Sequence, residues 1–287
     1  MGNHGRTSTG RGLKITGVAL IIIGALLYAV LGGPDDNPAA IFALPFMIIG
    51  PLVYFRGRQH AAKAVAEGTA SPIYDSKPDV LYLRSFRTDA ANMIKVLASG
   101  FSTEEEQLAD VLRPFGDMVA VGRPSEPLPM PGGSRIYASD AEWKNVVLHR
   151  MRSAPLVVIR AGTGAGLFWE VGQALSMLSP DKVLIFLFNL TTKDYAAFAD
   201  EVRSRFRIAL PAVGSPSLLR AIVDYRENPS KVLQGFVRFS DQWNPVFLPI
   251  PSTIIRFGYN DFKSSFNLAL RPVFERHGVA WQPAKRF

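Results

Sequence analysis

The chain has 287 residues, is 48% hydrophobic and 20% charged, and carries a formal net charge of +8. It contains no Cys, which excludes disulfides, thiolate metal sites and a Cys nucleophile together. Its four His residues are scattered without ligand spacing, so we expect no metal site. The bases form no stripe interleaved with aromatic residues. We therefore expect no nucleic-acid partner, and attribute the positive charge to contact with an anionic membrane leaflet.

Two uncharged apolar stretches, residues 15–32 and 39–55, lie close together near the start of the chain. A helix needs roughly 20 residues to cross the hydrocarbon core of a bilayer, within a range of about 17–25. A secretory signal peptide has a shorter apolar run and is not normally followed at once by a second one. The pattern therefore predicts a two-helix transmembrane hairpin within residues 15–56.

Charges beside these stretches predict the orientation of the hairpin. The flanking bases are Arg6, Arg11, Lys14, Arg56, Arg58 and Lys63. The connecting segment holds only Asp35 and Asp36. Because Lys and Arg collect on the cytoplasmic side, we expect both termini in the cytoplasm of a multi-pass protein of the cell membrane. We divide the chain into a basic N-terminus (1–14), the hairpin, a juxtamembrane linker (57–77) and a cytoplasmic domain (78–287).

The remaining sequence alternates short apolar runs with amphipathic segments. Strands are expected at residues 80–86, 118–122, 155–160 and 183–188, with a fifth at 236–240 or 246–250. Helices are expected after a capping box at Ser102/Glu105 or Thr103/Glu106, after another at Ser139/Glu142, and at 165–178, 195–206 and 261–277. Residues 123–134, rich in Pro and Gly, are expected to form a long loop.

This alternation predicts an α/β domain with a flavodoxin-like, doubly wound parallel sheet. Such sheets bind ligands at the carboxyl ends of their strands. The residues at or just after the ends of the predicted strands are the substrate-binding candidates: Arg84, Ser85, Phe86, Arg87, Asp89, Arg123, Gly162 and Trp169. The three arginines are candidates for holding phosphates, with a surface or ion-pair role as the alternative. Trp169, like Trp143, is a candidate for stacking on a base, although Trp143 also fits a core position.

Glu170 is the candidate catalytic residue. On a wheel of about 100° per residue, it lies about 60° from the axis of the apolar stripe of residues 165–178. We therefore expect its side chain at the boundary between the solvent and the hydrophobic core. A structural role, stabilising the positive N-terminus of the helix, remains open beside a chemical one. The glycines before it lack the third glycine of a dinucleotide fingerprint, since Leu167 stands there, so they serve either a phosphate or a tight turn.

Three segments carry a family resemblance: LYLRSFRTD, WKNVVLHRMRSAPLVVIRAG and GLFWEVGQAL. Together they resemble a bacterial Toll/interleukin-receptor (TIR) domain over residues 79–188. The resemblance implies that Glu170 assists cleavage of the nicotinamide–ribose bond of NAD. The family's Trp-Cys pair before that Glu is absent. The phrase WEVGQA is also similar to the Glu-Leu-Gly-x-Ala of nucleoside deoxyribosyltransferases, in which the Glu is the nucleophile, although the Asp usual upstream is missing here.

Both resemblances suggest one chemistry, a carboxylate facing the anomeric carbon of a ribosyl group. The leading hypothesis is a membrane-anchored domain that cleaves NAD or a related nucleotide in stress or defence signalling, with NAD as substrate and no cofactor. A second hypothesis is a non-catalytic module that associates with its own kind. A third is a nucleotide sensor that reports occupancy to the membrane helices.

Overall fold

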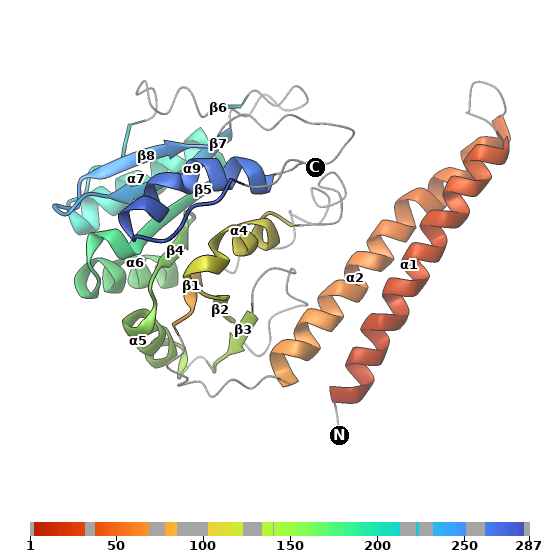
Figure 1. Cartoon of the computed structure of the whole chain (residues 1–287), viewed down its shortest axis with the longest axis horizontal. Helices are drawn as coiled ribbons and strands as arrows, with labels where there is room; N and C mark the ends of the chain where they lie inside the picture. Colours follow the sequence, from red (N-terminus) through yellow and green to blue (C-terminus); the bar gives the residue numbers. More distant parts are fainter. Residues whose placement is uncertain are drawn as a thin grey trace.

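The computed structural model describes residues 3–31, 38–68, 78–84, 103–122, 134–139, 141–212, 222–223, 232–250 and 262–283. It consists of a pair of long N-terminal helices beside an α/β domain (Figure 1). The long helices are α1 (Asn3–Leu31) and α2 (Leu44–Gly68), and a 3-10 helix, η1 (Pro38–Ala43), precedes α2. Helix therefore extends through most of the basic N-terminus and into the predicted linker.

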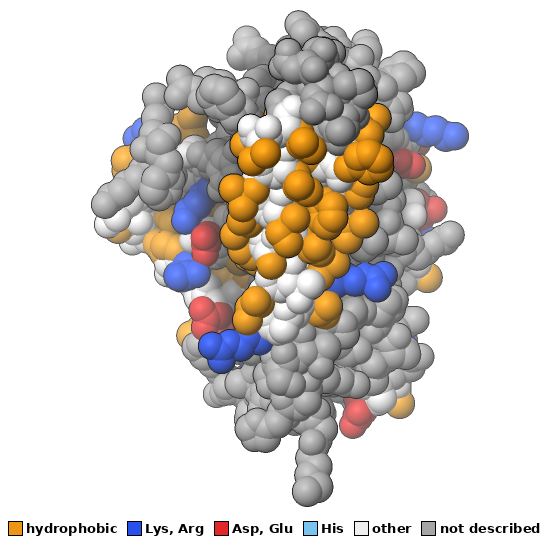
Figure 2. All heavy atoms as spheres, turned by 90° about the vertical axis from the view of Figure 1, so that its right-hand side faces the viewer, with side chains coloured by type: hydrophobic (Ala, Val, Ile, Leu, Met, Phe, Trp, Pro, Cys, Tyr) orange, Lys and Arg blue, Asp and Glu red, His pale blue; other side chains and the backbone are white. Residues whose placement is uncertain are grey.

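One helix, Arg11–Leu31, is long and apolar enough to cross a membrane, with 21 residues and a mean hydropathy of 2.2. Only 11% of its most apolar window is buried, so its side chains are not those of a soluble core helix. The second apolar helix, Ile41–Tyr54, is shorter. Figure 2 shows apolar side chains gathered on the outer face of the two helices. The large apolar side chains that are exposed on these helical segments include Ile15, Ile22, Leu26, Val30, Phe42, Ile48 and Ile49.

Glycines allow α1 and α2 to pack closely. The backbone of Tyr54 lies directly against Gly17, where a Cβ atom would have no room. A Cβ added to Gly50 would lie 2.8 Å from Cγ1 of Ile21, and one added to Gly24 would lie 3.0 Å from side-chain atoms of Phe46 and Met47. The helices are therefore in contact along much of their apolar length.

A single mixed sheet forms the centre of the α/β domain. The order of its main path is β3-β2-β1-β4-β5-β7-β6, and β8 also pairs with β7. The strands are β1 (Val80–Leu83), β2 (Met118–Gly122), β3 (Ser134–Tyr137), β4 (Val157–Arg160), β5 (Val183–Thr191), β6 (Ile222–Val223), β7 (Val232–Phe239) and β8 (Pro245–Pro249). From β3 to β5 the pairing is parallel. From β5 onward it is antiparallel, so the prediction of a wholly parallel sheet was wrong.

Helices cover both faces of this sheet. Helices α4 (Glu104–Leu112) and α9 (Phe262–Arg276) pack on one face, and α5 (Trp143–Ser153), α6 (Ala165–Met177) and α7 (Thr192–Phe206) pack on the other (Figure 1). Two short 3-10 helices, η3 (Arg113–Phe115) and η4 (Pro180–Lys182), precede β2 and β5. Alternate residues along the strands enter the two cores, so Leu81 and Ile159 lie on the α6 side while Tyr82 and Val158 lie on the α4 side.

The two predicted capping boxes have different outcomes. At α4, Thr103 and Glu106 form the box, with Thr103 Oγ1 accepting from the Glu106 N–H at 3.1 Å. At α5, Ser139 donates its hydroxyl to the Glu142 carboxylate at 2.6 Å, and the helix begins at Trp143 without a side-chain cap. The second box was therefore predicted wrongly, because the backbone turn closes on the Ser139 carbonyl instead.

Candidate functional site

The order of the strands reverses at β1, because β2 and β3 follow on one side of it while β4 and β5 follow on the other. The junction of β1 and β4 is therefore the place where open α/β sheets bind ligands, at the carboxyl ends of the strands. Arg84, Gly162, Trp169 and Glu170 all follow these two strands. The other candidates, Ser85, Phe86, Arg87, Asp89 and Arg123, lie outside the described residues.

A tight turn of four residues connects β4 to α6. Gly162 is half-buried within it, and Gly164 adopts a φ of 139° just before the helix begins at Ala165. An L side chain at position 164 would be strained, so the turn needs this glycine. No side chain caps the N-terminus of α6. Gly164 thus allows α6 to begin only five residues after the last residue of β4.

Glu170 lies in the second turn of α6 and is only 6% exposed. Leu167, Val171 and Ala174 of the same helix face the sheet and are buried. By its position on the helical wheel, Glu170 lies at one side of this stripe. Because it is beyond the first turn, stabilisation of the helix N-terminus does not explain its position.

Burial has a large effect on the Glu170 carboxyl group. In the part of the chain that the structure describes, it has no hydrogen bond and no ion pair. Removal from water disfavours the charged form, and this alone raises its pKa from 4.5 to about 8. Glu170 therefore carries a proton at neutral pH while the site is empty. Strongly perturbed carboxyl groups of this kind are typical of functional sites.

Two tryptophans lie on the α5 side of α6. The rings of Trp143 and Trp169 meet edge to face, with centroids 4.9 Å apart and an interplanar angle of 74°. Trp143 also lies close to Gly166, where an added Cβ atom would be in ordinary contact with the ring at 3.9 Å. Both indoles are half-buried, and the ammonium group of Lys144 lies over them. An aromatic surface with an exposed side therefore stands next to Glu170 in the sequence and beside the same strand ends.

Arg84 is placed differently from the other candidates. It is 8% exposed and lies on the α4 side of the sheet, 3.6 Å from Oε1 of Glu105. Arg160, at the end of β4, lies 3.5 Å from the same oxygen and 3.2 Å from Oε1 of Glu104. The Tyr82 hydroxyl donates to Glu105 at 3.4 Å. Arg84 therefore belongs to a buried network and does not lie beside Glu170.

This network, made of Tyr82, Arg84, Glu104, Glu105 and Arg160, was not predicted. Burial and then the Glu105 carboxylate raise the pKa of Tyr82. Burial opposes the charge of Arg160, but Tyr82 and the two carboxylates outweigh it and raise the pKa of Arg160. The sequence signal was an arginine closing each of two apolar strands, since a buried charge requires a partner.

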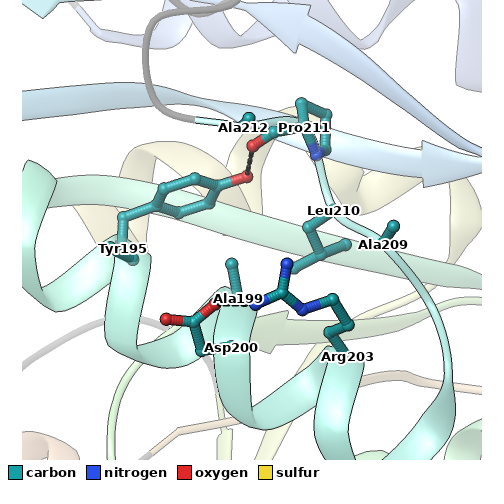
Figure 3. Close-up of a pocket in the computed structure, with 9 residues that line it drawn as sticks. Tyr195, Ala199, Asp200, Arg203, Ala209, Leu210, Pro211 and Ala212 are labelled. Carbon is teal, nitrogen blue, oxygen red and sulfur yellow. Dashed lines mark hydrogen bonds and ion pairs between the residues drawn. The ribbon is translucent and has the colours of Figure 1, made fainter.

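A pocket of about 200 Å³ lies elsewhere, between α7 and the residues that follow it. Figure 3 shows Tyr195 at its end, with its hydroxyl donating to the Pro211 carbonyl at 2.6 Å, and Asp200 and Arg203 along its wall. None of the predicted site residues lines it. It is smaller than the roughly 300–1,000 Å³ of typical ligand pockets, so we do not assign it a substrate.

Comparisons with protein-family models, with curated proteins and with solved structures found no match to this chain.

Proposed function

We propose that this chain is a membrane-anchored, TIR-like α/β domain that hydrolyses the N-glycosidic bond of NAD or a related nucleotide. The observation that carries the proposal is Glu170, a carboxyl group 6% exposed and without a partner in the described part of the chain. It lies beside the carboxyl ends of β1 and β4, where ligands bind in sheets of this kind. The Trp143–Trp169 pair offers a neighbouring surface for a planar base.

In the proposed reaction the bond between the anomeric carbon and the ring nitrogen breaks, and nicotinamide leaves as a neutral molecule. Water adds to the anomeric carbon and loses a proton, which yields ADP-ribose. Positive charge develops on the ribosyl ring as the base departs, and the ionised Glu170 carboxylate stabilises it. Because the base is cationic before cleavage, no general acid is needed for its departure.

A substrate with a cationic ring is also compatible with a Glu170 carboxyl group that is protonated in the empty site. A positive charge nearby favours the ionised form of a carboxyl group. The cationic ring therefore lowers the pKa that burial alone has raised to about 8. The carboxylate is then present when the substrate is bound, and the empty site avoids the cost of a buried charge.

A second candidate function is a non-catalytic TIR-like interaction or nucleotide-sensing module at the membrane. The engagement of Arg84 favours the interaction module, since an arginine held by Glu105 is not available to the phosphate of a nucleotide. Under this proposal the domain associates with other copies of itself, and the stress or defence signal passes through assembly. Concentration-dependent association of the full chain without release of base would support the interaction module over the first candidate, and tight nucleotide binding without release of base would support the sensing module.

The anchor we propose is a hairpin of α1 and α2 in the cell membrane, with both termini in the cytoplasm. Support comes from the apolar helix Arg11–Leu31, from the glycine contacts between the two helices, and from bases on the terminal flanks. The parallel strands follow the order β3-β2-β1-β4-β5, which differs from the flavodoxin-like order 2-1-3-4-5 that the sequence pattern predicted. Asp35→Cys should react with an impermeant maleimide from outside intact cells, and Ser71→Cys should not. The reverse pattern would invert the topology.

The test of catalysis uses the full chain in detergent or nanodiscs. We expect release of nicotinamide from NAD, and at least a 100-fold loss of that release in Glu170→Gln. Glu201→Gln, at an exposed position on α7, is the matched control and should retain full activity. Full turnover by Glu170→Gln would remove Glu170 from the mechanism, and absence of release from the unaltered chain would favour the non-catalytic candidate.

A further inference from the structure

Lys144 is the residue that occupies the exposed side of the tryptophan pair. Its ammonium nitrogen lies 5.3 Å from the ring centroid of Trp169 and 5.9 Å from that of Trp143. Both distances are within the roughly 6 Å over which a cation is attracted to the face of an aromatic ring. The two indoles thus already bind a cation, and the cation comes from the chain itself.

The contacts of Lys144 suggest that another cation can replace it. Within the described residues, its interactions are those with the two rings, and it has no ion pair. Its side chain is exposed, whereas the indoles are half-buried. When the ammonium group leaves the rings it enters water, so its displacement costs little beyond the cation–π contact.

The surroundings also favour a positive ligand. Trp143 is the first residue of α5, and Trp169 lies in the second turn of α6. Both helix starts lie at the carboxyl ends of the parallel strands, since α5 leads into β4 and α6 follows it. Glu170, directly after Trp169, supplies a buried acidic group that has no cation of its own in the described chain. The tryptophan pair and the Glu170 carboxyl group therefore both lie near the carboxyl ends of the parallel strands.

We propose that Lys144 is an internal competitor that limits the affinity of this site for a permanently cationic aromatic ring bound on Trp143 and Trp169. The proposal rests on the proposed function, because it assigns the base of the cleaved nucleotide to this surface. It makes Lys144 a specificity-determining residue. Neutral ligands do not gain from its removal, whereas N-alkylated, positively charged rings do.

The experiment measures binding to the full chain in detergent, without turnover. The probes are 1-methylnicotinamide, which is cationic, and nicotinamide, which is neutral and of nearly the same shape. Calorimetric titration is compared for the unaltered chain, Lys144→Ala and Lys144→Arg. Lys193→Ala, an exposed lysine on α7, is the matched control.

We expect Lys144→Ala to bind 1-methylnicotinamide about two- to fivefold more tightly, as loss of one exposed cation–π competitor implies. Its affinity for nicotinamide should not change, and Lys144→Arg and Lys193→Ala should resemble the unaltered chain. Equal tightening for both probes, no tightening, or no saturable binding of the cation would overturn the proposal. Charge-dependent tightening in a chain that releases no nicotinamide from NAD would uphold it and reject catalysis.

Discussion

Arg160 and Glu170 both follow the course of β4 toward the carboxyl ends of the parallel strands, but they lie on opposite faces of the sheet. Arg160 alternates with Ile159 along β4 and faces α4, where it meets Glu104 and Glu105. Glu170 is on α6, which packs on the other face. One face of the switch point is therefore filled with paired charges, whereas the other holds a carboxyl group without a charge partner among the described residues.

The first prediction concerns stability and pH. The pKa of Glu170 is raised from 4.5 to about 8 in the folded chain, so the unfolded state binds fewer protons between these values. The stability associated with the protonated group is complete below about pH 4.5 and is lost as the pH rises to about 8. Glu170→Gln avoids this loss. We expect it to match the unaltered chain at pH 4.5 and to exceed it by a few kcal/mol at pH 8.5.

Chemical denaturation of the full chain at the two pH values measures this difference. Glu201→Gln, whose carboxylate is exposed on α7, is the control and should follow the unaltered chain at both. A gap between Glu170→Gln and the unaltered chain that does not depend on pH would show that burial does not hold the proton on Glu170.

The second prediction concerns the pH dependence of turnover. Because the proposed mechanism uses the ionised carboxylate, kcat/KM for NAD should rise with pH and level off above about 8, the pKa of Glu170 in the free protein. The measurement is nicotinamide release at low NAD concentration between pH 5.5 and 9.5. A profile that falls through the same range would instead assign Glu170 the role of a general acid.

The third prediction concerns the buried network. Glu105 is 3% exposed and lies beside Tyr82, Arg84 and Arg160. Glu105→Ala removes the carboxylate that contacts both Arg84 and Arg160 and leaves their buried positive charge less compensated. The free energy of unfolding should therefore fall by about 3–5 kcal/mol. Asp110→Ala, on the exposed side of the same helix, should cost at most about 1 kcal/mol. Equal losses in the two variants would contradict the arrangement.

The fourth prediction concerns the helix pair. Gly17 lies against the Tyr54 backbone, so Gly17→Leu should push α1 and α2 apart by a few ångströms. The chain has no Cys, so spin labels can be attached at Ile22→Cys and Ile49→Cys without other changes. Gly12→Leu is the matched control, because a Cβ atom there has no neighbour within 4 Å. An unchanged distance in Gly17→Leu would show that the helices do not pack through this glycine.

Much of the parallel half of the sheet was predictable, because its strands are short, apolar and separated by amphipathic helices. The bounds of β2 were predicted correctly, and α6 ends only one residue before its predicted end. β5 extends to Thr191, beyond the predicted residue 188, and Thr191 then caps α7 with its hydroxyl. The predicted strand ended at residue 188 because the apolar run ends there, and the polar residues that continue β5 carry no such signal.

The antiparallel half was harder to predict. The segments 236–240 and 246–250 were alternatives for one strand, yet both contribute strands, β7 and β8, which pair with each other. In the parallel half, β3 was not predicted: it begins at Ser134, the last residue of the predicted loop, and has only four residues. Pairing between strands depends on partners distant in the sequence, which local patterns do not report.

The candidate site was predictable where a helical wheel decides burial, and less so where contacts between elements decide it. The helical wheel placed Glu170 between solvent and core, and the structure buries it, with only 6% of the residue exposed. Arg84 was a candidate for holding a phosphate, with an ion-pair role as the alternative, and the structure pairs it with Glu105 of α4. Glu105 was considered only as a member of a capping box, and a capping role gives no indication that its side chain reaches the ends of two strands.

Under the proposed function, the protonated state of Glu170 makes the binding of a cationic substrate depend on pH. A cation that arrives beside this carboxyl group displaces its proton into the buffer, so the heat of binding varies with the ionisation enthalpy of the buffer. Below about pH 8 the affinity for such a ligand rises as protons become scarcer. For the proposed substrate, acidification of the solution would therefore weaken binding, with no change in the amount of protein or ligand.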